Sequence, residues 1–252
     1  MFREYFVVLL LSHIIGDFYL QTEKVAKNKE KRLGWLCLHG LLYWVSFILV
    51  SLPIISLQLF FCGLVMGALH MIIDSIKYVA VNKKKKKKEL SINVKRTVYM
   101  IDQAVHLICI IIVSYFLATL KYDIRLINVC RDFFVITGIS AIKATCIFVA
   151  FLLIHKPANI TISHLIAGYK PMKELSEIQP QDYKAGRFIG SVERIIMLIL
   201  LALGQFSAIG LVLTAKSIAR YDEIAKNKIS AEYYLLGTLI STGFVIIVSF
   251  LL

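Results

Sequence analysis

Long runs of apolar residues alternate with short polar connections along the whole chain. Several of the runs approach or exceed the roughly 20 residues that a helix needs to cross a bilayer. Helices joined by short connections pack as antiparallel bundles. The pattern predicts an all-α, polytopic helical membrane protein with a four-helix N-terminal bundle. Its seven expected hydrophobic segments are Tyr5–Leu20, Leu33–Leu52, Ile54–Val81, Thr97–Leu120, Phe133–Ile154, Phe188–Ala215 and Tyr233–Leu252.

The segments divide the chain into four regions. Residues 1–120 hold the bundle, residues 121–155 the fifth membrane segment, and residues 188–252 the C-terminal membrane segments. Residues 156–187 contain three prolines and mixed charge, so we expect a cytoplasmic loop that starts at about His155. Two interpretations of the sixth segment stay open: it crosses fully, or it is re-entrant and bends at Gly204 or Gly210.

Composition and charge narrow the class of protein. With 58% hydrophobic and 18% charged residues, the chain is too apolar for an ordinary soluble domain. The net charge of +13 comes from Lys and Arg between the apolar segments, so we expect no nucleic-acid binding, because no folded basic face is available. Basic loops follow segments one and three, which places them in the cytoplasm and the N-terminus outside.

Histidines and aspartates inside the first four segments carry the candidate chemistry. Three His–Asp pairs are spaced by four residues, which places both side chains of a pair on one helical face. The pairs are His13/Asp17 in SHIIGDFYLQ, His70/Asp74 in HMIIDSIK and Asp102/His106 in DQAVH, and His39 stands alone in segment two.

All seven groups are expected at similar depth near the cytoplasmic ends of their segments. Ionisable side chains inside a membrane face the bundle interior, where three carboxylates would repel one another unless a cation neutralised them. We therefore predict a dinuclear site for divalent metal, with Zn²⁺ preferred and Mn²⁺ or Fe²⁺ as alternatives, since the ligand set holds no thiolate. Intrahelical hydrogen bonds or a proton relay are the competing interpretations.

These motifs resemble an uncharacterised bacterial inner-membrane family, catalogued as a domain of unknown function. The C-terminal stretch that begins GRFIGSVERIIMLILLALGQFSAIGLVLTAKSIARYDEI carries the resemblance further. It implies a multi-pass protein of the bacterial cytoplasmic membrane. More loosely, the HxxxD helices are similar to those of membrane-bound metal-dependent hydrolases of the zinc phospholipase C and P1 nuclease-like group. That likeness covers His13/Asp17, His70/Asp74 and His39, whereas Asp102/His106 departs from it by its reversed order.

The functional hypothesis is a metal-dependent hydrolase. A metal-bound water would attack a membrane-associated substrate, of which a lipid or isoprenoid phosphoester is the favoured class. Gln21, Ser75, Lys77 or Gln103 could orient it. The alternatives are a metal-ion or proton-coupled transporter that uses the same layer, and a scaffold with a structural metal. In the C-terminal part, the candidates for binding substrate or an anion are Glu193, Arg194, Lys216 and Arg220.

Overall fold

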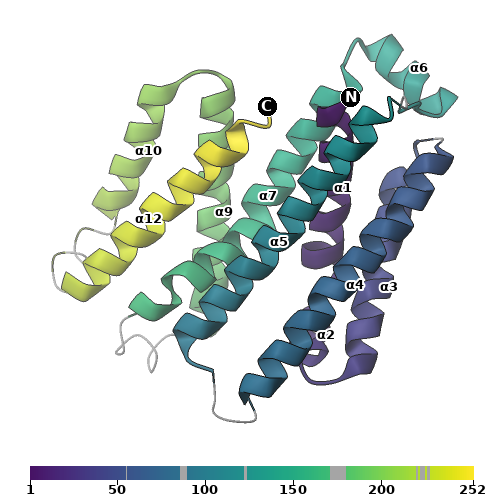
Figure 1. The fold of residues 1–252 in the computed structure, drawn as a ribbon. Helices are drawn as coiled ribbons and strands as arrows, with labels where there is room; N and C mark the ends of the chain where they lie inside the picture. The colour runs from purple at the N-terminus through teal and green to yellow at the C-terminus, as the bar shows by residue number, and fades with distance from the viewer. Residues whose placement is uncertain are drawn as a thin grey trace. The chain divides into compact units, whose positions relative to one another are not determined.

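The computed structural model describes residues 1–54, 56–85, 90–121, 124–170, 180–219, 221, 225 and 228–252. These residues are mainly helical, and apart from an isolated bridge between Ile54 and Leu126 they form no strand. The predicted all-α class is confirmed (Figure 1). The chain divides into two compact units, unit 1 over Met1–Val149 and unit 2 over Ala150–Leu252.

Unit 1 contains the expected four-helix bundle. Its elements are α1 Phe2–Ile14, the π-helix η1 Ile15–Leu20, α2 Glu23–Lys29, α3 Leu33–Ser51, α4 Leu57–Lys85, α5 Ile92–Thr119 and α6 Asn128–Thr137. Contacts run from α1 to α3, from α3 to α4, from α4 to α5 and from α5 back to α1, so the four helices close a ring. Their inward faces therefore share one interior.

Small residues let α3 and α4 approach closely within this ring. A Cβ atom at Gly40 would overlap the Met71 side chain, and one at Gly63 would overlap the ring of Phe47. Gly40 follows His39 directly, so the close approach occurs where α3 presents its histidine to α4. Small residues at such contacts are typical of helix packing in membranes.

The described helices of unit 2 pack around a small apolar core. It comprises the second part of α7 Ala141–Ile166, the 3₁₀ turn η2 Ala167–Tyr169, α9 Pro180–Ala202, α10 Phe206–Ala219 and α12 Lys228–Ser249. α9 packs against both α10 and α12. The core residues are Ala150, Ile154, Met197, Leu198, Val245 and Val248.

The fifth expected segment is wrong in its boundaries. α6 ends at Gly138, whose φ of 67° is the left-handed conformation that glycine adopts readily at a helix end. α7 then runs on to Ile166, although we expected a loop from about His155. Pro157 lies inside this helix, and close by the Arg194 side chain donates to the Ile154 carbonyl at 2.6 Å. Such side-chain donors help a membrane helix to accommodate proline.

The sixth expected segment is two helices rather than one. The chain reverses between α9 and α10, and Gly204 has a φ of 68° at this break. In Figure 1, α10 returns beside α9 as a helical hairpin. The chain therefore bends at Gly204, one of the two glycines at which the re-entrant interpretation expects a bend.

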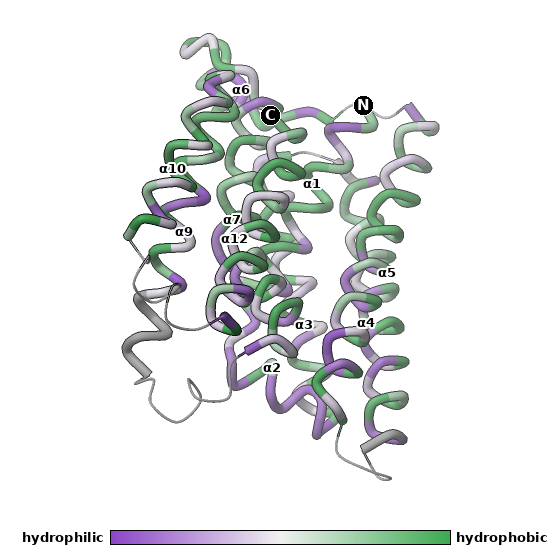
Figure 2. The backbone as a smooth tube through the Cα atoms, turned by 90° about the vertical axis from the view of Figure 1, so that its left-hand side faces the viewer, coloured by the Kyte–Doolittle hydropathy of each residue, from purple (hydrophilic) through white to green (hydrophobic). Residues whose placement is uncertain are grey.

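The surface and length of the helices are those of a membrane protein. In the described ranges, five helices are long and apolar enough to cross a membrane, or six if α1–η1 and α2, which meet at 94°, are counted as one bent span. Large apolar side chains point outward from α4 and α5, among them Phe61, Ile76, Ile112, Tyr115 and Phe116. Figure 2 shows that the end of unit 1 that carries α2 is the more hydrophilic one.

Candidate metal centre

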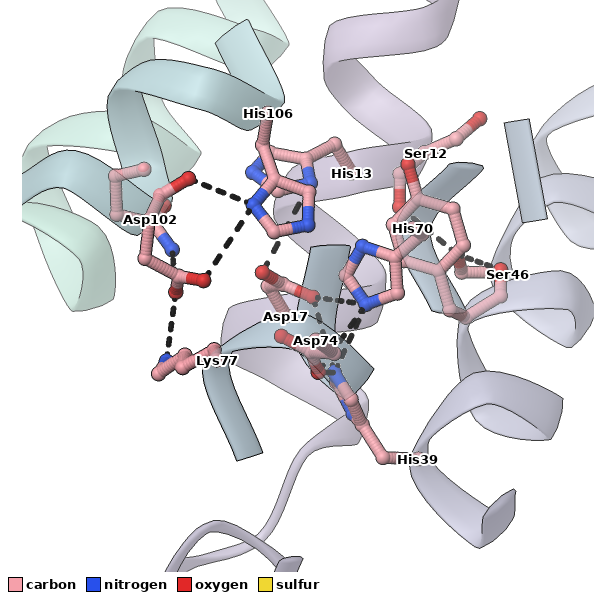
Figure 3. A network of polar contacts seen from close by, with 12 residues as sticks. Ser12, His13, Asp17, His39, Ser46, His70, Asp74, Lys77, Asp102 and His106 are labelled. Carbon is pink, nitrogen blue, oxygen red and sulfur yellow. Dashed lines mark hydrogen bonds and ion pairs between the residues drawn. The ribbon is translucent and has the colours of Figure 1, made fainter. Parts of the chain in front are cut away.

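Seven buried side chains meet inside the unit 1 bundle (Figure 3). They come from every helix of the ring, and we call them the His/Asp cluster. It consists of His13 on α1, Asp17 on η1, His39 on α3, His70 and Asp74 on α4, and Asp102 and His106 on α5. These are the seven residues that the sequence assigned to one layer.

Four of these side chains converge at the centre of the cluster. The Nε2 atoms of His39 and His70 face each other at 3.0 Å. Each also lies 3.3 Å from Oδ1 of Asp17. The Oδ2 atom of Asp74 lies 3.3 Å from His39 Nε2 and 3.8 Å from His70 Nε2. We call His39, His70, Asp17 and Asp74 the tetrad.

The spacing of the tetrad matches the ligand shell of a tetrahedral metal ion. Metal–ligand bonds of 2.0–2.2 Å, as for zinc, separate neighbouring ligand atoms by about 3.3–3.6 Å. The five measured separations span 3.0–3.8 Å around these values. Two imidazoles and two carboxylates form a donor set that suits Zn²⁺, Mn²⁺ or Fe²⁺.

A second group of ligands adjoins the tetrad on the α5 side. Atoms of Asp74, Asp102 and His106 lie within 4.8 Å of one another. The Nδ1 atom of His106 lies 2.8 Å from the Asp102 backbone carbonyl, and if it donates there, the lone pair of Nε2 is left free. Within the described part of the chain, His106 Nε2 and the Oδ1 atoms of Asp74 and Asp102 are buried without a hydrogen-bond partner.

His13 completes the cluster from α1. Its Nδ1 atom lies 3.9 Å from Asp17 Oδ2, and His13, Asp17 and His70 form a third group with atoms within 4.8 Å. The imidazole rings of His13 and His106 stack with their centroids 5.2 Å apart. Because the three groups share His70, Asp17 and Asp74 with the tetrad, the cluster is continuous and has donor atoms for more than one ion.

The π-helix explains how Asp17 reaches this position. π-helical turns are rare and occur often at functional sites. Gly16, in this turn, lets the backbone touch α3, because a Cβ there would lie 2.8 Å from Cδ2 of Tyr43. Where α1 gives way to η1, the Ser46 hydroxyl donates to the Ser12 carbonyl at 2.8 Å. The Tyr43 ring in turn stacks on His70 at 3.8 Å, nearly parallel, and so restricts the imidazole plane.

Two lysines enter the cluster. Lys29 Nζ donates to Asp74 Oδ2 at 2.9 Å, and Lys77 Nζ donates to Asp102 Oδ2 at 2.7 Å. We expected Lys77 among the polar groups near the site, but Lys29 was assigned only to a basic connection. The sequence signal for Lys29 is its spacing: it follows Val25 by four residues, so the two side chains share one face of the helix that starts after Thr22. In the structure both side chains are buried.

The C-terminal candidates are engaged with other parts of unit 2. Arg194 donates to the Ile154 carbonyl, to Asn159 Oδ1, and to the hydroxyls of Ser191 and Ser241. Lys216 Nζ lies 2.6 Å from Glu193 Oε2. Arg220 lies outside the described residues. The described contacts of Glu193, Arg194 and Lys216 are thus made within unit 2.

Comparison with protein families identifies the family of this chain. The family described as Protein of unknown function (DUF3307) matches residues 5–135, which is just over half of the chain. The chain belongs to this family. Comparison with curated proteins and with solved structures returned no match.

The DUF3307 match contains the whole His/Asp cluster and both lysines, whereas unit 2 lies beyond it. The family description assigns no activity, and no comparison shows a likeness to hydrolases. The chemical argument for this DUF3307 protein therefore rests on the geometry of its own residues.

Proposed function

We propose that this protein is a metal-dependent hydrolase of the bacterial cytoplasmic membrane, whose His/Asp cluster holds a dinuclear centre near the cytoplasmic face. The observation that carries the metal site is the tetrad: its four donor atoms come from three different segments, and five of their six separations are 3.0–3.8 Å, close to those of a tetrahedral shell. Zn²⁺ is the preferred ion, with Mn²⁺ or Fe²⁺ as alternatives.

The neighbouring ligands support a second ion. Asp74 belongs to both the tetrad and the group with Asp102 and His106, so its carboxylate is in a position to bridge. Among the described residues, its Oδ1 atom is buried without a hydrogen-bond partner, as are Asp102 Oδ1 and His106 Nε2. Burial of polar atoms without partners is costly, which favours a bound ion that uses them.

Bound metal ions would supply a nucleophilic water at neutral pH and would polarise the oxygen of the bond to be cleaved. The substrate that we propose is a phosphoester of a membrane-associated amphiphile, either a lipid or an isoprenoid. Water adds to phosphorus, the ester P–O bond breaks, and the leaving alcohol takes up a proton. The protein residues hold the ions and exclude bulk water.

Access favours an enzyme over a transporter. A transporter needs a polar route to both faces of the membrane. The interior of the bundle beyond the cluster is filled by buried apolar side chains, including Val7, Leu9, Phe47, Leu59 and Ile110. The buried hydroxyls of Ser46 and Ser114 donate to carbonyls of their own or a neighbouring helix. This arrangement supports a site that opens at one end.

Elemental analysis of the detergent-purified full-length protein tests the metal centre. We expect near-stoichiometric Zn, Mn or Fe in the wild type and its loss in a His70→Ala/Asp74→Ala variant. The matched control is His155→Ala/Asp132→Ala, which removes the same residue types from exposed positions and should retain the metal. Absence of metal in the wild type, also after incubation with each ion, would overturn the proposal.

Activity is tested next with the metal-loaded protein. We expect release of inorganic phosphate from phosphatidate or an isoprenyl phosphate in mixed micelles, and no release by the His70→Ala/Asp74→Ala variant. If the protein instead takes up metal into proteoliposomes, if this uptake requires the cluster, and if no phosphate is released, the transporter function would replace the hydrolase function.

A further inference from the structure

Lys29 and Lys77 approach the His/Asp cluster from two different elements. Lys29 extends from α2 to Asp74, and Lys77 extends from α4 to Asp102. Both ammonium groups lie within direct hydrogen-bonding distance of a carboxylate that also belongs to a candidate metal-binding group. The two cations are thus part of the site itself.

The fold of α2 directs Lys29 inward. The helix turns off η1 at 94°, and the Thr22 hydroxyl caps its start by accepting from the Val25 amide. Val25 and Lys29 share the buried face, whereas the Lys27 side chain is 78% exposed. One lysine of a short basic helix is therefore selected for the interior, and the preceding lysine, Lys27, serves as a natural reference.

On α4, Lys77 continues the face that carries the metal ligands. His70, Asp74 and Lys77 follow at intervals of four and three residues, which places them on one side of the helix. The side chains of Lys77 and Lys29 are 19% and 11% exposed, compared with 1% for His70 and 2% for Asp74. No residue of the cluster is more than 7% exposed, so the two lysine side chains are the most accessible part of the site, and we call them its accessible edge.

Charge balance indicates what this edge can bind. Three aspartates and two lysines sum to −1 when the histidines are neutral. One divalent ion changes the sum to +1, and two change it to +3. A metal-loaded site with two ammonium groups at its accessible edge is thus cationic in a low-dielectric interior, where an anion is bound strongly.

We infer that Lys29 and Lys77 form the anion subsite of this centre and hold the phosphoryl oxygens of the substrate beside the metals. The inference rests on the proposed function, and it narrows the substrate to compounds with a terminal, doubly charged phosphate group. Ammonium groups act as point charges that suit phosphate oxygens. Their present carboxylate partners hold them in place at the edge of the site.

Phosphate binding to the Co²⁺-substituted protein tests the inference without relying on turnover. The full-length protein is placed in phosphatidylcholine nanodiscs and titrated with inorganic phosphate, while the visible Co²⁺ spectrum is recorded. Loss of one charge-assisted contact should raise the midpoint about tenfold or more in Lys29→Met and in Lys77→Met. Lys27→Met should match the wild type, and Lys29→Arg should restore most of the affinity.

A second titration uses nanodiscs that contain phosphatidate, to separate a lipid phosphate from free phosphate as the source of the anion. A spectral change with phosphatidate alone assigns the subsite to a membrane phosphomonoester. A change with inorganic phosphate alone assigns it to a soluble anion. Either result supports the subsite if it depends on Lys29 and Lys77.

Two results would overturn the inference. In one, Lys29→Met and Lys77→Met retain Co²⁺ and keep the wild-type midpoint, so that the lysines only neutralise carboxylates. In the other, both variants lose Co²⁺, which makes the lysines supports of the metal site. A wild type that holds no metal at all overturns the proposed function first, and the inference with it.

Discussion

The two units bury their polar groups in opposite ways. In unit 2 the Arg194 guanidinium donates to four acceptors, and its side chain is almost wholly buried. In unit 1 the His/Asp cluster is equally buried, yet each of its seven residues has a ring nitrogen or a carboxylate oxygen without a hydrogen-bond partner in the part of the chain that the structure describes. Both networks lie within apolar helices.

The difference distinguishes a network whose polar groups are satisfied from a candidate metal centre. Arg194 links α7, α9 and α12, and each of its hydrogen bonds goes to a carbonyl, amide or hydroxyl oxygen. In the cluster, Oδ1 of Asp74 and Asp102 and Nε2 of His106 are buried without a hydrogen-bond partner among the described residues. Such burial is costly unless a cation neutralises the carboxylates. These atoms, rather than the number of charged residues, mark the candidate metal centre.

Removal of the metal should have the largest effect. A ligand that binds only the folded state at about 1,000 times its Kd adds about 4 kcal/mol to the free energy of unfolding. Chelation should therefore lower the Tm of unit 1 and leave that of unit 2 unchanged. Both tryptophans, Trp35 and Trp44, lie on α3, so their fluorescence reports on unit 1. A fluorescence unfolding transition that is unchanged by chelation would contradict a stabilising metal in unit 1.

Arg194→Met should destabilise unit 2 by about 2–4 kcal/mol, because four hydrogen bonds of about 0.6–1 kcal/mol each are lost. Metal content should remain that of the wild type. Thermal unfolding followed by circular dichroism measures the change, and the exposed Arg187→Met on the same helix is the control. Loss of metal in Arg194→Met would show that the two networks are coupled.

Gly16→Ala should weaken the metal site by about 1–3 kcal/mol, since overpacking against Tyr43 shifts the π-helix that carries Asp17. Competition with a chromogenic zinc chelator measures the affinity. Gly34→Ala is the matched control, because a Cβ there meets nothing within 4 Å. Equal metal affinities of Gly16→Ala and Gly34→Ala would show that the packing of the π-helix does not affect the metal site.

Tyr43→Leu should have the smallest effect, about 1 kcal/mol or fivefold in metal affinity, through loss of the ring stacked on His70. Tyr43→Phe keeps the ring and should bind metal like the wild type. The same chelator competition applies. If Tyr43→Phe binds metal as weakly as Tyr43→Leu, the Tyr43 hydroxyl rather than the stacked ring supports the centre.

The four long helices of the unit 1 bundle and the membership of the His/Asp cluster could be predicted from the sequence alone. A spacing of four fixes two side chains on one helical face through local geometry alone. The cost of ionisable groups inside apolar segments then requires those faces to point inward. For His13, His70 and Asp102, no tertiary information was needed to expect a common interior.

The features that depend on contacts between distant residues are visible only in the tertiary structure. Lys29 is one lysine among several in a basic connection, and the bend before α2 selects it. α7 continues through Pro157, in a place where Arg194, 37 positions further on, donates to the helix backbone. Asp17 reaches the tetrad through a π-turn that Gly16 permits against α3. In each case, packing between segments far apart in the chain decides the outcome, which the local sequence leaves open.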